Sequence, residues 1–241
     1  TKVIFKLEEY DRLDKAIDNG MLPAMAVGLS AVHKANFIAG LFKKYGKSLV
    51  LTNDETAAAK LCDDLNAMLG EDCALLYPAK DFVFRHIDGV SHEYEQQRLG
   101  VLSRLAQGES VIVCCSVDAL LQLTIPKEQL LARSVELTAG QQITMEDLIR
   151  ILSAAGYVRR PQVDGSSQFS VRGGIVDFYP PDRPAPIRVE LWGDEIVTIS
   201  AFELDTQRRT DTMHSVKVTP AFEVLADSPE DLKNRIERLK A

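Results

Sequence analysis

The most constraining feature of the sequence is an alternation of short apolar runs and longer helical patterns between residues 48 and 114. Ser48–Thr52, Ala74–Tyr77 and Ser110–Cys114 are predicted strands, because each is a run of four or five largely apolar residues bounded by turn residues. A helix ending at Leu69 and a second helix at Glu93–Ala106 are predicted between them. Strands and helices in alternation predict an α/β domain with a parallel sheet flanked by helices.

Three further elements are predicted at the N-terminal side of this domain. Lys6–Ile17 carries apolar residues at near-helical spacing, and His33–Tyr45 is a second helical pattern that Gly46 ends. Pro23–Gly28 is predicted to be a short buried strand, and Asn53 or Asp54 is expected to cap the helix that ends at Leu69.

The pattern changes after Pro126, where short strands with turn signals between them replace the alternation. One helix is predicted at Thr144–Ala155, and the tail from Val216 is predicted to be a strand followed by a helix that starts near Ser228–Pro229. This region predicts a small α+β domain with an antiparallel sheet, inserted in or following the first domain. Its predicted strands are Phe169–Arg172, Ile175–Tyr179, Ile187–Trp192 and Ile196–Phe202.

The segment between the predicted strand at Pro23–Gly28 and the next helix lies where an α/β domain places a phosphate-binding loop. Gly28 and Lys34 occupy the positions of the first glycine and the lysine of G-x-x-x-x-G-K-[ST], but His33 replaces the second glycine and Ala35 replaces the serine or threonine. An imidazole obstructs close approach to phosphate, and alanine offers no oxygen to Mg²⁺. We therefore predict a degenerate loop that does not hydrolyse ATP. The alternative interpretation, an ordinary strand-to-helix turn, also predicts no ATP hydrolysis.

One strand of the second domain predicts a binding surface. In Ile187–Trp192 a period of two places Arg188, Glu190 and Trp192 on the face that points away from the core. Arg172 has the same orientation on its own strand, so we expect Arg172, Arg188 and Trp192 to form one surface patch, with the composition of a binding hot spot. The alternative is that Trp192 is a core residue and Arg188 pairs with a neighbouring Glu on a solvated face.

Two stretches carry a family resemblance. Phe169–Pro180 and Ile187–Ile196 resemble the signature F-x-V-R-G-x-x-x-D-[IV]-[FY]-P … [IY]-R-[IV]-[ED]-F-[FW]-G-D-E-[IV], which the excision-repair helicase UvrB shares with the bacterial transcription-repair coupling factor, Mfd. Phe202–Arg208 is similar to the F-D-x-x-T-Q-R of the coupling-factor family. The degenerate loop also favours coupling factors, because UvrB keeps an intact one, and Tyr77–Glu95 is too short for the long aromatic hairpin of UvrB.

This resemblance implies an architecture and a function. It implies a degenerate nucleotide-binding-like domain at residues 1–126 and 216–241, interrupted by a UvrA-binding domain at residues 127–215. The family positions credited with UvrA contact match Arg172, Arg188 and Trp192, the last of which is commonly Phe. It further implies a fragment whose full-length protein is an ATP-dependent translocase, which contacts RNA polymerase and DNA through other domains and covers this face with its own C-terminal domain.

Three alternatives remain open on the residues alone. The chain could be an active UvrB-like ATPase fragment with a nucleotide at Lys34, or a nuclease that binds a metal through Arg85–Asp88 and His92 with Glu93 or Glu95. It could also bind DNA directly through its arginine clusters. The spacing of the histidines and carboxylates between residues 85 and 95 matches no metal-ligand pattern, so we expect neither a metal nor a cofactor. The arginine clusters are Arg159–Arg160 and Arg208–Arg209.

Composition limits the compartment and the type of partner. The 241 residues include 28 Lys and Arg against 35 Asp and Glu, a formal net charge of −7. This balance disfavours strong non-specific DNA binding, which depends on neutralising phosphates. Four cysteines without a C-x-x-C pair, no signal peptide and no apolar run long enough to span a bilayer predict reduced thiols in a cytoplasmic protein without membrane contact.

Overall fold

The computed structural model describes residues 7–70, 72–80 and 93–223, together with positions 230, 233 and 237. Contacts divide the chain into two compact units. Unit 1 comprises residues 1–84 and 107–122, and unit 2 comprises residues 85–106 and 123–241. The predicted start of a helix near Ser228–Pro229 lies outside the described residues.

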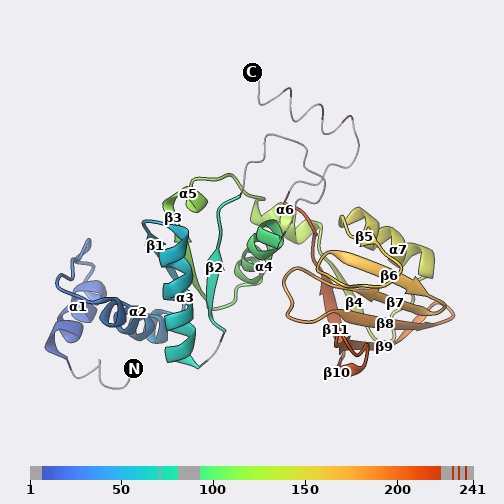
Figure 1. The fold of residues 1–241 in the computed structure, drawn as a ribbon, viewed down its shortest axis with the longest axis horizontal. Coiled ribbons are helices and arrows are strands. Elements are labelled where there is room, and N and C mark those ends of the chain that lie inside the picture. The colour runs from blue at the N-terminus through green and yellow to red at the C-terminus, as the bar shows by residue number, and fades with distance from the viewer. Residues whose placement is uncertain are drawn as a thin grey trace. The chain divides into compact units, whose positions relative to one another are not determined.

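Unit 1 contains a three-stranded sheet in the order β1-β3-β2, with every strand parallel to its neighbour. This confirms the predicted parallel sheet, and each of its strands begins within two residues of the predicted start. Its elements are α1 (Glu8–Asp18), α2 (Ala31–Tyr45), β1 (Ser48–Thr52), α3 (Glu55–Leu69), β2 (Ala74–Tyr77), β3 (Ile112–Ser116) and α5 (Val117–Leu120) (Figure 1).

Two helices of unit 1 carry the end signals that the sequence predicts. Asp54 caps α3, since its carboxylate accepts a hydrogen bond of 2.7 Å from the backbone N–H of Ala57. Gly46 ends α2 in the left-handed conformation, with φ of 78°. One core joins both helices to the sheet, and its buried members are Ala35, Ala39, Ala58, Cys62, Leu65, Ala74, Ile112 and Cys114.

The predicted strand at Pro23–Gly28 is wrong. The segment has no regular structure, and Met25 and Val27 are 88% and 80% exposed. A strand needs a neighbour that satisfies its backbone hydrogen bonds, and within the described residues the sheet of unit 1 contains only β1, β2 and β3. Apolar composition predicted burial here, but it carries no information about a pairing partner.

Unit 2 is built around a six-stranded sheet in the order β10-β9-β8-β7-β6-β5. Neighbouring strands are antiparallel except for β5 and β6, which are parallel. The sheet therefore confirms the four predicted strands and adds a short strand at each edge. Its elements are β5 (Val158–Arg159), β6 (Gln168–Arg172), β7 (Ile175–Phe178), β8 (Ile187–Trp192), β9 (Glu195–Phe202) and β10 (Arg209–Met213).

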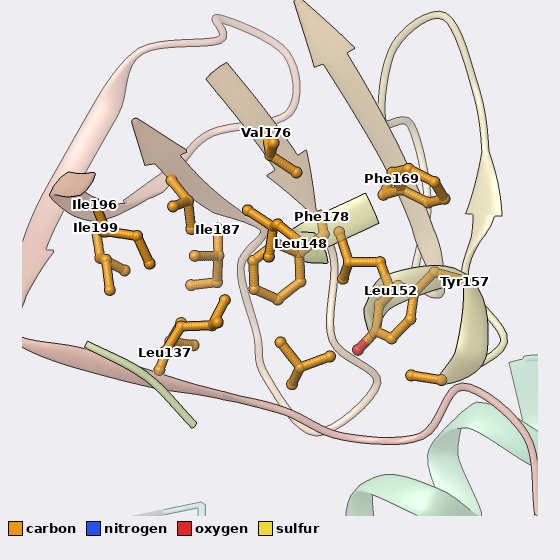
Figure 2. Packing of buried hydrophobic residues seen from close by; sticks show 14 of the residues in the cluster. Leu137, Leu148, Leu152, Tyr157, Phe169, Val176, Phe178, Ile187, Ile196 and Ile199 are labelled. Carbon is orange, nitrogen blue, oxygen red and sulfur yellow. The ribbon is translucent and has the colours of Figure 1, made fainter. Parts of the chain in front are cut away.

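One face of this sheet carries the core of unit 2. Leu148 and Leu152 of α7 (Met145–Ala154) pack against the inward residues of β6 to β9, and Leu137 joins from a separate ribbon of β4 (Val135–Thr138) and β11 (Ser215–Val218). Figure 2 shows these side chains converging on Phe178. Thr144, at the predicted start of this helix, caps α7 by accepting from the N–H of Asp147 at 3.1 Å. With one face covered, the other face of the sheet is available for polar side chains.

Helix α4 (Glu93–Ala106) belongs to unit 2, together with the short helix α6 (Lys127–Ala132). A Cβ on Gly100 would lie 2.9 Å from the carbonyl oxygen of Pro181, so glycine permits this close approach. Arg98 is fully buried and donates to Glu223 at 2.7 Å. The sequence assigned both α4 and β11 to the first domain, and the domain division that the resemblance implies stays a prediction.

Among the described residues, no helix is both long enough and apolar enough to cross a membrane. The four cysteines are buried and form no disulfide, which agrees with the predicted reduced thiols. A hydrogen bond with Cys62, together with burial, raises the pKa of the Cys114 thiol, so this thiol stays protonated in the core of unit 1.

Candidate functional site

Strand β8 alternates between the two faces of its sheet as the sequence predicts. Ile187, Val189 and Leu191 are buried on the core face, and Trp192 at the end of the strand is exposed. The inward residues fix the orientation of β8, because a slip of one residue would exchange its two faces. Packing in the core therefore determines which side chains reach the outer face.

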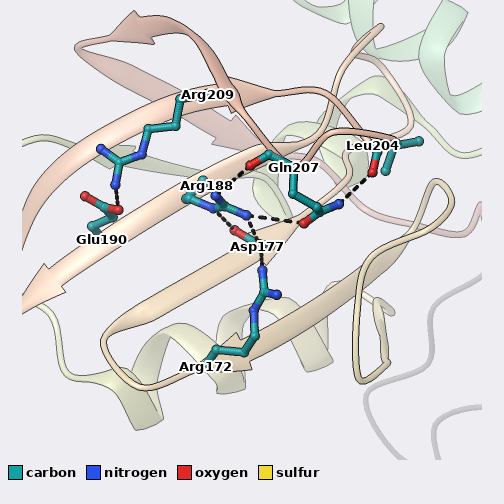
Figure 3. A network of polar contacts seen from close by, with 7 residues as sticks. All are labelled: Arg172, Asp177, Arg188, Glu190, Leu204, Gln207 and Arg209. Atoms are coloured by element: carbon teal, nitrogen blue, oxygen red, sulfur yellow. Dashed lines mark hydrogen bonds and ion pairs between the residues drawn. The ribbon is translucent and has the colours of Figure 1, made fainter.

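On the outer face, two arginines share one buried carboxylate (Figure 3). Asp177 of β7 faces Arg188 of β8 in register, and it accepts from Arg188 Nε at 2.7 Å and from Nη2 at 2.9 Å. Arg172 of β6 donates through Nη2 to the same carboxylate at 2.6 Å. We call these three residues the arginine–aspartate cluster. Two cations share one anion, so the cluster carries one net positive charge.

The surroundings of Arg188 are those of a buried group. Its guanidinium also donates to the backbone carbonyl of Gln207 at 3.1 Å, and its Cζ lies 4.6 Å from the ring centroid of Phe202. The hydrogen bonds with Asp177 raise the pKa of Arg188 further above its usual range, so the group is always charged. Its side chain is only 11% exposed. The outward orientation predicted for Arg188 is confirmed, but its predicted exposure to solvent is wrong, because Asp177, Gln207 and Phe202 cover it.

Arg172 holds the accessible charge of the cluster. Its side chain is 46% exposed, whereas that of Asp177 is 1% exposed. A guanidinium has five N–H donors, and Asp177 takes one of those of Arg172. Arg172 can therefore pair with a further carboxylate without leaving Asp177.

Trp192 stands at the end of β8 and is 82% exposed, which excludes the alternative of a core tryptophan. The tight turn of Gly173 and Gly174 lies beside it, since Leu191 donates its N–H to the carbonyl of Gly174 at 2.8 Å. Arg172 and Trp192 are separated by two strand spacings and two residues, so their Cα atoms lie roughly 12 Å apart. One protein partner can contact both side chains.

The outer face holds residues that the sequence analysis did not single out. Asp177, Phe202 and Gln207 all lie within the quoted signature stretches, yet none was assigned a role there. The residue type of Asp177 could have indicated its role. An acidic residue in a strand, between the apolar residues Val176 and Phe178, needs a cationic partner when it is buried. A second ion pair, between Glu190 and Arg209, lies on the same face (Figure 3).

The residues of the predicted phosphate loop lie at the start of α2. Gly28 has φ of 76°, and Ser30 caps the helix by accepting from the N–H of His33 at 3.4 Å. His33 and Lys34 are exposed in the first helical turn, whereas Ala35 is fully buried against α3 and the sheet. The position that offers a metal-binding hydroxyl in an active loop is therefore a core position in this chain.

Two other predicted sites have different outcomes. Arg85–Asp88 and His92 lie outside the described residues, and the part of the chain that the structure describes holds no group of three or more His, Cys, Asp and Glu side chains placed to bind a metal ion. Arg159, Arg160 and Arg208 are exposed, but Arg209 is committed to Glu190.

The family model described as "UvrB interaction domain" matches residues 135–223, which include the whole arginine–aspartate cluster and Trp192. The transcription-repair-coupling factor of Bacillus subtilis (strain 168) is 30% identical over 233 residues, which cover 96% of this chain and 20% of that protein. The corresponding protein of Staphylococcus aureus (strain USA300) is 30% identical over 231 residues, 92% of this chain and 19% of that protein.

A third relative, the transcription-repair-coupling factor of Staphylococcus epidermidis, is 29% identical over 217 residues, 90% of this chain and 18% of that protein. The chain thus spans about a fifth of the length of these curated relatives. Nearly all of this chain is homologous to the N-terminal fifth of the transcription-repair-coupling factors, and it contains a UvrB interaction domain.

Proposed function

We propose that this chain is the non-catalytic, UvrB-like N-terminal module of a transcription-repair coupling factor, and that it recruits UvrA to stalled RNA polymerase in transcription-coupled nucleotide excision repair. The homology and the UvrB interaction domain support the general assignment. The observation that carries the proposal is Trp192, 82% exposed on the same sheet face as Arg172, which is 46% exposed and shares the carboxylate of Asp177 with Arg188.

The chemistry of this face suits a protein partner. An exposed indole offers a large apolar surface and one N–H donor, and tryptophan and arginine are the residue types most enriched in interface hot spots. A guanidinium pairs with a carboxylate through two parallel hydrogen bonds, which fixes orientation as well as adding affinity. We therefore assign Arg172 to an acidic group of UvrA and Trp192 to an apolar niche beside it.

Arg188 has a different role in this proposal. Its donors are used by Asp177 and Gln207, and its side chain is 11% exposed. We assign it as a positioning residue: it holds Asp177, and Asp177 in turn holds the guanidinium of Arg172. Loss of Arg188 then weakens UvrA binding through the position of Arg172 rather than through a lost contact.

The remaining features of the module belong to the proposal as well. Unit 1 is interpreted as a degenerate nucleotide-binding-like domain in the cytoplasm that neither binds nor hydrolyses ATP, because Ala35 is a core residue and His33 replaces a loop glycine. In the full-length protein, other domains engage RNA polymerase and DNA, and the C-terminal domain covers the sheet face of Trp192 until it is released.

Calorimetry with purified UvrA tests this proposal. Trp192→Ala and Arg172→Ala are each expected to weaken UvrA binding by about 30-fold or more, which is the effect of losing one interface anchor. Arg150→Ala is the matched control, because Arg150 is a 77% exposed arginine on α7, which covers the opposite face of the sheet. Equal affinities for the wild type and all three variants would exclude this face as the binding site.

A further inference from the structure

Strand β9 contains a β-bulge on the outer face of the sheet, close to Trp192. The register with β8 shifts there: Glu190 faces Thr198, but the next residue, Leu191, faces Ile196. Val197 is therefore the extra residue of β9 and has no partner on β8. A β-bulge re-aims one side chain and is a typical feature of functional edges and sites.

The bulge turns Val197 towards solvent. Ile196 and Ile199 on either side of it are fully buried in the core, whereas Val197 is 50% exposed. Apart from Phe202, which is buried beneath Arg188, the neighbouring residues of β8 and β9 on this face are polar or charged: Arg188, Glu190, Thr198 and Ser200. Val197 is an exposed apolar residue among these polar ones. A period of two along β9 does not predict its exposure, because the bulge adds one residue to the strand.

Val197 and Trp192 are near neighbours across the hairpin. Trp192 faces Glu195, two residues before Val197, which makes the pair a diagonal cross-strand pair. Side chains in that relation lie roughly 7–8 Å apart, within reach of an aromatic ring. Both side chains are open to solvent, Trp192 by 82% and Val197 by 50%, so two apolar groups are accessible at this end of the hairpin.

We propose that Val197, presented by this bulge, forms with Trp192 the apolar part of the surface that binds UvrA. This inference rests on the proposed function and extends the site beyond the three residues that carry it. The occupant is a protein surface with an apolar niche wide enough for both side chains and an acidic group next to it. We place the acidic group opposite Arg172, because two arginines share the single carboxylate of Asp177 and Arg172 is the exposed one.

The test compares Val197→Asp and Val197→Thr with the wild type in calorimetric titrations with purified UvrA. Asp places a charge in the niche and is expected to weaken binding by about tenfold or more. Thr keeps the shape and strand preference of valine but exchanges a methyl group for a hydroxyl, so a smaller loss of about threefold is expected. Val158→Asp is the control, because Val158 is 43% exposed at the opposite edge of the same sheet.

Circular dichroism and the unfolding midpoint establish whether each variant is folded. If Val197→Asp does not fold, Val197→Thr still provides the test. The inference is overturned if both Val197 variants bind as tightly as the wild type while Trp192→Ala does not, and the proposed function then still stands. If Trp192→Ala also binds normally, the proposed function fails, and the inference fails with it.

Discussion

Asp177 and Arg188 face each other in register across β7 and β8 and form a two-point ion pair with N–O distances of 2.7 and 2.9 Å. The carboxylate is 1% exposed and the guanidinium side chain 11% exposed. Neither charge can return to water while the sheet is intact, so each needs the other. The surface that we assign to a partner is thus supported by an ion pair that belongs to the stability of the domain.

The first prediction follows from that dependence. Asp177→Ala leaves the Arg188 guanidinium covered by Phe202 and Gln207 without its counter-ion, which is expected to cost about 3–5 kcal/mol of unfolding free energy. Urea unfolding measures this loss. Glu190→Ala is the control, because its partner Arg209 is 47% exposed and remains hydrated, so about 1 kcal/mol or less is expected. Equal losses in the two variants would contradict a buried role for Asp177.

A second prediction concerns Tyr157, whose hydroxyl donates to the backbone carbonyl of Thr219 at 2.9 Å. Complete burial, with the negative charge of Asp182 nearby, raises the pKa of Tyr157 well above its usual value of 10.0. In the unfolded chain this phenol ionises near pH 10, while in the folded state it stays neutral. Its contribution to stability is therefore intact below pH 10 and is lost as the pH rises above it.

Stability curves between about pH 9 and 11.5 test the Tyr157 prediction. Above pH 10 the wild type should lose up to about 1.4 kcal/mol more per pH unit than Tyr157→Phe, which has no phenol to ionise. Tyr157→Phe should be the less stable protein at pH 7, because the Thr219 carbonyl loses its donor. Parallel curves for the two proteins would show that the phenol is not buried as described.

A third prediction concerns the turn beside Trp192. A Cβ on Gly174 would lie 2.7 Å from the carbonyl oxygen of Leu191, a backbone atom that cannot move without shifting β8. Gly174→Ala is therefore expected to cost about 1–3 kcal/mol and to lower UvrA affinity by displacing the indole. Gly165→Ala is the control, since its new Cβ meets only the end of the flexible Gln168 side chain, at 3.3 Å. A Gly174→Ala protein as stable as that control would refute this account of the turn.

The sequence predicted most of the elements because their patterns are local. The alternation in Ile187–Trp192 gives the orientation of β8 without knowledge of its neighbours, and a cap such as Asp54 lies next to the helix that it begins. The outward positions of Arg172, Arg188 and Trp192 follow from the same rule. These are the predictions that the structure confirms.

The errors arise where an outcome depends on residues far apart in the chain. Pro23–Gly28 has the composition of a buried strand, but no described strand pairs with it. The burial of Arg188 depends on Phe202 and Gln207, which come from β9 and the loop after it. The bulge at Val197 depends on the register between β8 and β9. Pairing partners and register are tertiary properties, and the periodicity of a single segment does not contain them.

A fourth prediction concerns nucleotide. At 100 times its dissociation constant, Mg·ATP bound to a working phosphate loop would stabilise the fold by about 2.7 kcal/mol, which is a readily measured shift in the thermal midpoint. We expect no shift, because Ala35 is packed in the core of unit 1 and offers no oxygen to the metal. A shift that appears in the wild type and disappears in Lys34→Ala would overturn this expectation and support an active nucleotide site.

The last prediction separates the two contacts of the proposed surface by their dependence on salt. Raising the salt concentration from about 0.1 M to about 1 M shortens the Debye length from about 10 Å to about 3 Å, which weakens the pairing of Arg172 with an acidic group. The UvrA affinity of the wild type should therefore fall across this range, whereas that of Arg172→Ala should fall less.

Trp192→Ala should bind UvrA more weakly than the wild type at every salt concentration, but its affinity should depend on salt as strongly as that of the wild type, because burial of an indole is not screened. Trp192→Phe keeps an aromatic ring, so it should recover most of the affinity that Trp192→Ala loses. If Arg172→Ala showed the full salt dependence of the wild type, the free charge of the arginine–aspartate cluster would have no part in binding, and the assignment of Arg172 would have to be abandoned.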